Sequence, residues 1–256
     1  FNSYPYYDYK THSVDFEGML STLAKVPRGD VVLLHGCCHN PSGADLSQDQ
    51  WIAIKDLALK QGFTIFVDLA YQGMGDGLEE DVVGVRLLAE SLPELIVVSS
   101  CSKNFGLYRE RTGAISLICQ NEVAASSAST LLAAAARANY SMPPDHGAAI
   151  VQLIYEDSFL YSMWQEELKG VRDRINGLRV TFSESLKQSG ADNDFGFIQK
   201  EKGMFSFLGV TQSQIQELIN KYAIYLVDSS RINVASINKG NIDYVTESIV
   251  NVIKIP

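Results

Sequence analysis

The order of apolar runs in the first half of the chain most constrains what it can fold into. Short buried-strand patterns occur at Val31–Leu34, Phe63–Val67, Leu95–Ser99 and Ala114–Ile118. Helical patterns separate the first three, and this alternation predicts parallel strands joined by helical crossovers. The fourth run follows the third so closely that an antiparallel direction is also open. The expected fold class is therefore α/β, with a mainly parallel sheet sandwiched by helices.

The helices between these runs have recognisable boundaries. Ser47 and Gln50 form an S-x-x-Q capping box at the start of the first helix, and Gly62 is a typical residue at its end. A second helix is predicted at Asp81–Ser91, between the second and third runs.

The middle of the chain carries one long helical pattern. Apolar residues recur every three or four positions from Leu160 to Leu186, and the pattern ends at Gly190. The remaining chain predicts a smaller unit of helices and strands. Its expected elements are strands near Met204–Leu208, at Ile224–Val227 and at Ile232–Ala235, a helix capped by Thr211 and a last helix from Asn241. We expect a boundary between two domains inside the long helix, between residues 170 and 171.

Composition narrows the possible partners. Lys and Arg total 21 against 30 Asp and Glu, which gives a net charge of -9. Such an acidic chain is a poor match for nucleic acid or an anionic membrane surface, and no apolar run approaches the roughly 20 residues of a membrane helix. The 4 cysteines favour reduced thiols over a disulfide framework, which indicates the cytoplasm, with an organelle also open. The chain begins at Phe1 rather than Met, so we expect it to start inside a longer protein.

Polar residues follow three of the predicted strands at the point where each strand ends. His39–Gly43 follows the first run, Asp68 and Tyr71 follow the second, and Ser99–Asn104 follows the third. In open α/β sheets, ligands bind beyond the carboxyl ends of the strands. We therefore expect these groups, which are far apart in the sequence, to converge on one crevice.

The side chains expected in this crevice suit one kind of cofactor. The amine of Lys103 can form a Schiff base with a carbonyl group, and the carboxylate of Asp68 can pair with a pyridinium nitrogen. Further donors can bind the other polar groups of such a ring, with Tyr71 and Asn40 for a phenolic oxygen and Ser100, Ser102 and Arg111 for a phosphate. Each residue alone also has a plain structural explanation, such as a turn or a solvated charge.

Several stretches around these residues form a recognisable series. HGCCHNPSGADL (His35–Leu46) is similar to an H-x-C-C-H-N-P-T-G segment, with Ser42 in place of Thr, and SSCSKNFGLYRERTG (Ser99–Gly113) surrounds Lys103. The others are FVDLAYQGMGDGLEED (Phe66–Asp81), RANYSMPPDHGA (Arg137–Ala148), GMFSF (Gly203–Phe207) and SSRINVA (Ser229–Ala235), where Ser230 stands in place of the usual Gly. With these stretches in order along its whole length, the chain resembles the aspartate and aromatic amino acid aminotransferases, class I enzymes of fold type I.

The resemblance implies a role for each matching residue. Lys103 would carry pyridoxal 5'-phosphate and shuttle the proton, and Asp68 would pair with the pyridine nitrogen. The other cofactor contacts would be made by Asn40 and Tyr71 at the ring oxygen, and by Ser100, Ser102 and Arg111 at the phosphate. The substrate contacts would be made by Arg231 at the α-carboxylate, by Asn40, by Phe205 in the pocket wall, and by Arg137 at a distal carboxylate.

The implied activity is transfer of an amino group between an amino acid (aspartate, glutamate or aromatic) and a 2-oxo acid. The implied assembly is a homodimer in which Arg137 reaches the neighbouring site, and aspartate or aromatic preference stays open because relatives of both kinds keep this arginine. Residues 1–170 would be the C-terminal part of the large cofactor-binding domain, and residues 171–256 the small domain. Relatives also have an N-terminal third, so we expect the chain to be an incomplete piece of such an enzyme. The alternative is a truncated or non-catalytic relative that folds and associates without turnover.

Other site types fit less well. His35, Cys37, Cys38 and His39 lie close in the sequence, but strand alternation sends neighbours to opposite faces and no C-x-x-C pair exists, so no metal site is expected. The glycines of the stretch after Tyr71 have G-x-G-x-G spacing rather than the G-x-G-x-x-G of a dinucleotide loop. The G-x-S-x-G elbow of a serine hydrolase does not occur.

Overall fold

The computed structural model describes residues 1–191 and 194–254. The chain forms two compact units, and each is described by itself. The first unit comprises Phe1–Tyr4, Phe16–Cys37 and Leu46–Lys169. The second comprises Pro5–Asp15, Cys38–Asp45 and Gly170–Pro256, so it also takes two short segments from the N-terminal part of the chain. The domain boundary between residues 170 and 171 stays a prediction about the parent protein.

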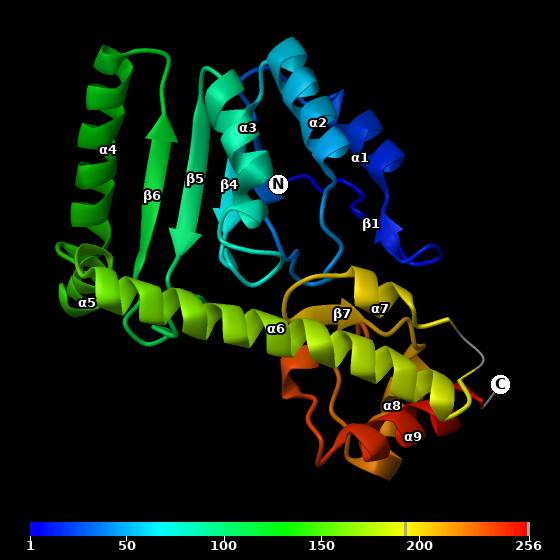
Figure 1. Ribbon diagram of the computed structural model, residues 1–256. Coiled ribbons are helices and arrows are strands. Elements are labelled where there is room, and N and C mark those ends of the chain that lie inside the picture. The colour runs from blue at the N-terminus through cyan, green and yellow to red at the C-terminus, as the bar shows by residue number, and fades with distance from the viewer. Residues whose placement is uncertain (192–193, 255–256) are drawn as a thin grey trace. The chain divides into compact units, whose positions relative to one another are not determined.

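A 4-stranded sheet forms the centre of the first unit, in the order β3-β4-β5-β6 (Figure 1). β3 (Val31–His35), β4 (Thr64–Leu69) and β5 (Leu95–Ser100) run parallel, whereas β6 (Gly113–Ile118) runs antiparallel to β5. The predicted α/β class is confirmed. The fourth predicted strand, β6, is antiparallel, which is the direction that the short connection after β5 had left open.

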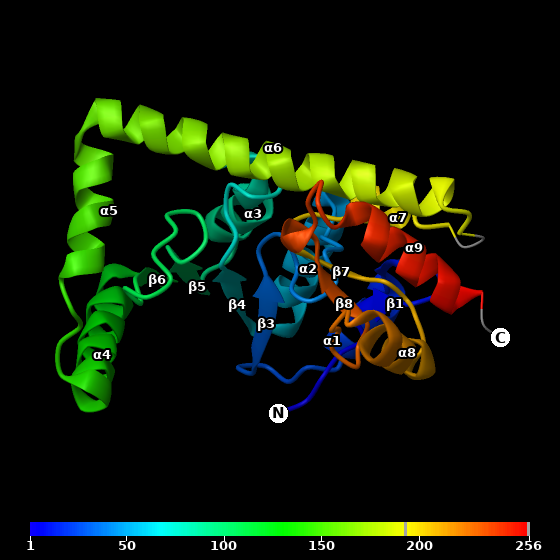
Figure 2. The same cartoon turned by 90° about the horizontal axis from the view of Figure 1, so that it is seen from below.

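Helices cover one face of this sheet (Figure 1 and Figure 2). α2 (Gln48–Gln61) and α3 (Val83–Ser91) contact each other, with η1 (Glu80–Val82) directly before α3 and α1 (Phe16–Leu23) beside α2. The strand side chains that are buried alternate along β3 and β4 and are Val32, Leu34, Ile65, Val67 and Leu69. Val31 and Leu33, which alternate with them in β3, are exposed.

The predicted boundaries of α2 are confirmed in detail. The Ser47 side chain accepts a hydrogen bond from the Gln50 backbone amide, and the Gln50 side chain accepts one from the Ser47 backbone amide. Gly62 ends the helix with a φ of 77°. A side chain at that φ would cost roughly 1 kcal/mol or more, so glycine is the natural residue there.

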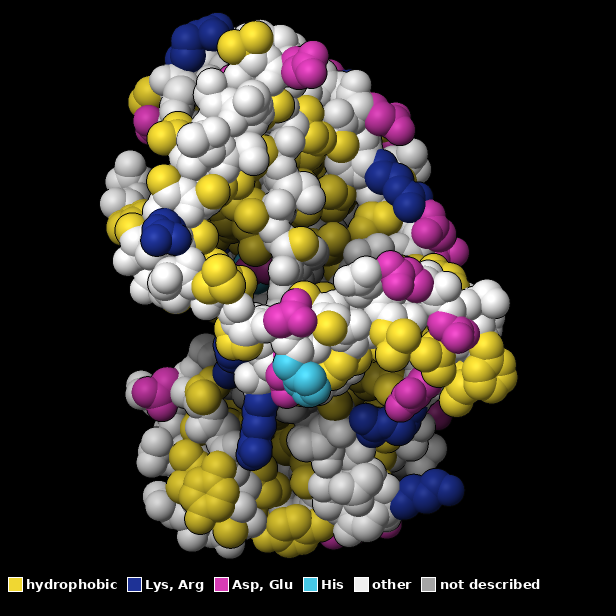
Figure 3. Space-filling model, turned by 90° about the vertical axis from the view of Figure 1, so that its left-hand side faces the viewer, with side chains coloured by type: hydrophobic (Ala, Val, Ile, Leu, Met, Phe, Trp, Pro, Cys, Tyr) yellow, Lys and Arg dark blue, Asp and Glu magenta, His cyan; other side chains and the backbone are white. Residues whose placement is uncertain are grey.

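Three further helices follow the sheet along the chain. They are α4 (Glu122–Tyr140), α5 (His146–Glu156) and α6 (Ser158–Gln188), of which α6 was predicted from its apolar period. No residue of α4 is buried in the described structure. Apolar side chains are exposed over α4 and α5 (Figure 3), and the large ones include Val123, Leu131, Tyr140, Leu153 and Tyr155. Among residues 1–191 and 194–254, no helix has the length and apolar composition that a bilayer crossing requires.

The second unit combines short strands with helices around its own core. β7 (Phe205–Phe207) pairs antiparallel with β8 (Arg231–Asn233), and β1 (Tyr7–Asp8) pairs with β2 (Ser13–Val14). The helices are α7 (Phe197–Lys200), α8 (Gln212–Tyr222), α9 (Ile242–Ile253) and the C-terminal part of α6, with the 3-10 turn η2 (Val234–Ser236) after β8.

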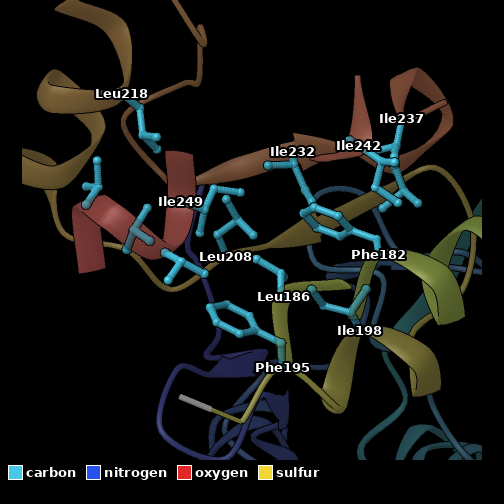
Figure 4. Packing of buried hydrophobic residues seen from close by; sticks show 14 of the residues in the cluster. Phe182, Leu186, Phe195, Ile198, Leu208, Leu218, Ile232, Ile237, Ile242 and Ile249 are labelled. Carbon is cyan, nitrogen blue, oxygen red and sulfur yellow. The ribbon is translucent and has the colours of Figure 1, made fainter. Parts of the chain in front are cut away.

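The core of this unit gathers side chains from α6 to α9, from β8 and from the segment after β7 (Figure 4). Phe182 and Leu186 of α6 are fully buried and belong to the same cluster as Ile198, Leu218 and Ile249. Each such side chain contributes about 1.5–3 kcal/mol when it is removed from water. The C-terminal part of α6 is therefore integral to this unit.

One predicted strand is wrong and another is shorter than predicted. Ile224–Val227 forms no strand in the described structure, because the Ile224 amide donates to Leu218 O at the end of α8 and the Ser230 amide donates to Val227 O. Ile224 and Leu226 nevertheless pack against the core, so their alternation reports burial without strand pairing. β8 ends at Asn233, whose side chain accepts from the Ala235 amide and so begins η2.

Candidate active site

The ends of β4 and β5 bring Lys103 and Tyr71 together. Asp68 is the second-last position of β4 and pairs in register with His35 of β3 and Val98 of β5. Tyr71 follows β4 and is only 6% exposed. Lys103 follows β5, and its Nζ lies 4.8 Å from the centroid of the Tyr71 ring. An amine, a phenol and a carboxylate thus lie at neighbouring strand ends, as the strand order predicts.

Backbone contacts hold the Lys103 segment against its neighbours. The Cys101 amide donates to Thr112 O at 3.0 Å, and the Gly106 amide donates to Lys103 O at 3.2 Å. Asn104 Nδ2 donates to the carbonyl of Gln72 at 3.3 Å, which ties the residue after Lys103 to the residue after Tyr71. These contacts fix the approach of the amine to the phenol.

Trp164 supports the same segment and was not predicted as a site residue. Its Nε1 donates to Asn104 O at 2.8 Å, and its ring stacks on Phe105 with centroids 4.4 Å apart. In the sequence Trp164 is simply one apolar position of the long helical pattern. The motif around Lys103 does not predict this contact, because the hydrogen bond joins residues that are 60 positions apart in the sequence.

The glycine-rich loop after Tyr71 is organised by Asp81. The Asp81 carboxylate accepts backbone hydrogen bonds from Gly73 at 2.8 Å, Gly75 at 3.0 Å, Asp76 at 2.7 Å and Gly77 at 3.4 Å. A Cβ at Gly75 would lie 2.6 Å from Asp81 Oδ1, so the close approach requires glycine. Sequence reasoning placed Asp81 only at a helix start and so missed its role as the anchor of this loop.

The residues predicted to hold a phosphate lie where β5 leads toward β6. The Ser102 amide donates to Ser100 Oγ at 3.1 Å, and Ser102 is 6% exposed. Arg111 is exposed, has a φ of 53°, and donates from Nη1 to Tyr108 O at 3.1 Å. Gly113 pairs with Ser100 in the β5–β6 ladder, which places Arg111 just before β6. Hydroxyls, amides and a guanidinium suited to a phosphate therefore occupy one loop system.

His35 lies beside Asp68 in the sheet, where the two residues pair in register. Burial lowers the pKa of His35, and the nearby Asp68 opposes this shift only in part. The pKa of His35 is thus lowered by its burial beside Asp68, which favours the neutral imidazole. An anionic carboxylate at this strand end suits a protonated ring nitrogen.

A second group of predicted residues gathers in the second unit. Arg231 Nη1 donates to Asn40 Oδ1 at 3.2 Å, and Arg231 Cζ lies 4.7 Å from the centroid of the Phe205 ring. Arg231 of β8 pairs with Phe207 of the antiparallel strand β7, two residues from Phe205, so the ladder sets the spacing of Arg231 and Phe205. A guanidinium stacked on an aromatic ring and steadied at one edge suits bidentate binding of a carboxylate.

The turn before Arg231 accommodates Ser230 with a φ of 61°. This left-handed conformation explains why glycine is usual at the position. The serine offsets part of its conformational cost, because its Oγ accepts from the Gly209 amide at 3.1 Å. The replacement therefore leaves Arg231 at the start of β8.

Arg137 belongs to neither group. It is in the last turn of α4, on the exposed surface of that helix, where its carbonyl accepts from the Ser141 amide. The structure thus assembles the predicted residues as a lysine group in the first unit, an arginine group in the second unit and an exposed arginine on α4.

The α/β fold and the lysine group are what the comparison with known protein families can be set beside. Residues 1–249 match the family described as aminotransferase class I and II. The chain belongs to this family.

Relatives and solved structures agree with that assignment. An aspartate aminotransferase of Haemophilus influenzae is 46% identical over 250 residues, which cover 98% of this chain and 63% of the relative. An aromatic-amino-acid aminotransferase of Paracoccus denitrificans is 44% identical, with 98% and 64% covered. The crystal structure of an aromatic-amino-acid aminotransferase from Burkholderia pseudomallei, covalently bound to pyridoxal phosphate, superposes with a TM-score of 0.96 at 42% identity and with 98% and 63% covered. The predicted fold type is confirmed, and the chain spans less than two thirds of the length of these relatives.

Proposed function

We propose that the protein is a pyridoxal-phosphate-dependent aminotransferase that acts on aspartate, glutamate or aromatic amino acids. The observation that carries the proposal is the placement of the Lys103 amine 4.8 Å from the Tyr71 ring at the strand ends where Asp68 also lies. The names of the relatives, which include aspartate and aromatic-amino-acid aminotransferases, support the substrate classes.

The donor set fits the proposed cofactor group by group. Lys103 provides the amine that bonds to the carbonyl carbon, and Asp68 provides the carboxylate for the ring nitrogen. The remaining polar groups of the cofactor would be held by Tyr71 and Asn40 at the ring oxygen and by Ser100, Ser102 and Arg111 at the phosphate. When bound, pyridoxal phosphate supplies an electron-withdrawing ring that stabilises negative charge at the substrate α-carbon.

The chain's own residues would orient the substrate and move the proton. Arg231 binds the α-carboxylate, with Asn40 at one edge of its guanidinium and Phe205 against its face. The amine of Lys103 would then take a proton from the substrate α-carbon as a general base and deliver it, as a general acid, to the former carbonyl carbon of the cofactor. In this proposal the carboxylate is bound by Arg231 and the proton is moved by Lys103.

The exposed face of α4 supports a homodimer as part of the proposal. This helix buries none of its side chains in the described structure and carries Arg137 beside large apolar side chains. A second copy covering this face would bring Arg137 toward the neighbouring site, where it would bind the distal carboxylate of a dicarboxylic substrate. We place the protein in the cytoplasm, because its four cysteines form no disulfide within the described residues.

Borohydride labelling tests the cofactor assignment. After addition of pyridoxal phosphate, we expect an absorbance band that borohydride removes, and peptide mapping should locate the reduced adduct on Lys103. The expected stoichiometry is one adduct per chain, because one lysine is placed beside Tyr71 and Asp68. A label spread over several surface lysines, or none on Lys103, would contradict the proposal.

Substitution of Arg137 tests the substrate assignment. Arg137→Leu should lower the catalytic efficiency for aspartate by roughly 10- to 100-fold, the worth of a charge-assisted hydrogen bond, and should change that for phenylalanine far less. Arg137→Lys, which keeps the charge but not the bidentate geometry, is the matched control. Its catalytic efficiency for aspartate should lie between those of wild type and Arg137→Leu. Steady-state kinetics with both amino acids give the answer, and equal losses would remove the proposed role.

A further inference from the structure

A buried charged pair lies in the second unit, outside the groups that hold cofactor or substrate. Arg179 of α6 is 1% exposed and Glu201 is 3% exposed. Arg179 Nη1 lies 3.6 Å from Glu201 Oε2. Burying two charges is costly and is by itself weak evidence of a stabilising role. The role of the pair is therefore inferred from the backbone segment that Arg179 binds.

Arg179 gathers one chain segment around its guanidinium. Its Nε donates to Gly203 O at 3.2 Å, and its Nη1 donates to Ile198 O at 3.1 Å and to Ser206 Oγ at 2.7 Å. Its Nη2 donates to Phe205 O at 2.7 Å, and also to Lys202 O and Gly203 O. One side chain thus binds five residues between Ile198 and Ser206. One of them is Phe205, whose ring lies against Arg231.

The same segment contacts the loop that carries Asn40. The Lys202 amide donates to Gly43 O at 2.8 Å. A Cβ at Gly43 would lie 2.5 Å from Phe205 O, and one at Gly203 would lie 2.5 Å from Cys38 Cβ. The approach of the two segments is therefore close, and movement of one displaces the other. Both neighbours of Arg231, Asn40 and Phe205, depend on it.

Glu201 closes the cluster on its other side. Ser206 Oγ donates to Glu201 Oε2, and Tyr7 Oη donates to Glu201 Oε1 at 3.2 Å. Ser206 therefore links Arg179 to Glu201, and it is itself 0% exposed between Phe205 and the remainder of β7. The carboxyl group of Glu201 faces the guanidinium, and carbonyls of the segment accept from its donors.

We propose that Arg179, Glu201 and Ser206 form a positioning cluster that holds Phe205 and Asn40 against Arg231 and so sets the affinity of the protein for the substrate carboxylate. The cluster contacts no reacting atom. This inference rests on the proposed function, because it takes Arg231 as the carboxylate-binding residue.

Carboxylate binding measures the role of the cluster directly. The test compares wild type, Glu201→Gln and Ser206→Ala, each loaded with pyridoxal phosphate, for binding of 3-phenylpropanoate and of succinate by calorimetry. Ser206→Ala is the milder change and remains informative if Glu201→Gln does not fold. Glu247→Gln, a change at an exposed residue of α9 in the same unit, is the matched control.

The expected result is a Kd raised at least about tenfold for both acids in both cluster variants, the effect of losing one well-placed hydrogen bond to a charged group. Faster amide hydrogen exchange at 198–207 and 38–45 should accompany it. Adduct formation at Lys103 should be unchanged, and so should the Kd of Glu247→Gln. A role in stability alone would lower the melting temperature and leave the Kd of the folded protein unchanged.

The outcomes separate this inference from the proposed function. Cluster variants that bind both acids within twofold of wild type would overturn the inference and leave the cofactor assignment intact. A wild type that is labelled on Lys103 but does not bind either acid would refute the role of Arg231, and the inference would fall with it. A wild type without label on Lys103 would refute the proposed function. The same Kd and exchange comparisons, made on the proteins without cofactor, would then decide the inference, because Arg231, Asn40 and Phe205 contact one another within the chain.

Discussion

Replacement of Lys103 by alanine should abolish both capture of pyridoxal phosphate and turnover. The side chain has two proposed tasks, since its amine forms the covalent bond to the cofactor and also moves the proton at the substrate α-carbon. Loss of the proton transfer alone should lower the rate by roughly 10² to 10⁴, and loss of the covalent bond adds to this. The absorbance band, borohydride incorporation and turnover with aspartate and phenylalanine are the measurements.

Tyr71→Phe provides the matched control for this substitution. It keeps the ring that lies 4.8 Å from the Lys103 amine and removes only the hydroxyl. The band should therefore persist in Tyr71→Phe, at a shifted wavelength because the ring oxygen loses a donor. Persistence of the band and of incorporation in Lys103→Ala would show that another lysine carries the cofactor.

The proximity of Lys103 and Tyr71 could be predicted from the sequence. The two residues are 32 positions apart, yet each follows one of two adjacent parallel strands, and the carboxyl ends of such strands meet at one edge. The capping box at Ser47 and the glycine at residue 62 were equally predictable, because helix ends depend on local hydrogen bonds. Features set by neighbours along the chain, or by strand order, could thus be inferred before the structure.

Features that depend on contacts between segments of the folded chain could not be inferred from the sequence. Ile224 and Leu226 alternate as a strand would, but they pack against the core without a strand partner in the described residues. Asp81, Trp164 and Arg179 each act through hydrogen bonds with backbone groups, and a backbone donor or acceptor leaves no trace in residue type. Arg179 in particular reads as one polar position in a long amphipathic helix, and only its 1% exposure shows that it faces inward.

Glu201 should make the stability of the protein depend on pH in a way that Glu201→Gln does not. Burial raises the pKa of Glu201 to about 7 from its usual 4.5, although hydrogen bonding by Ser206 and the charge of Arg179 oppose the shift. Asp45 adds to the rise, and Tyr7 faces the same carboxylate as a hydrogen-bond donor. The folded state therefore holds a proton on Glu201 over a pH range in which the unfolded chain has released it.

The sign of the effect follows from this difference in proton binding. Between about pH 4.5 and pH 7 the folded state binds more protons than the unfolded state, so the free energy of unfolding decreases as the pH rises. At about 1.4 kcal/mol per unit of pKa shift, the contribution lost between pH 5 and pH 8 is roughly 2–3 kcal/mol. That is a large share of a total stability of about 5–15 kcal/mol.

Urea unfolding at several pH values tests this expectation. The free energy of wild type minus that of Glu201→Gln should fall by roughly 2–3 kcal/mol from pH 5 to pH 8, since both proteins share every other titrating group and differ only at residue 201. The same difference taken with Glu247→Gln should stay nearly constant, because that side chain is exposed. A wild-type minus Glu201→Gln difference that is independent of pH would mean that the buried carboxylate stays ionised throughout, held by Arg179. The cluster would then be a permanent ion pair, and its hold on Phe205 and Asn40 would not change across the neutral range.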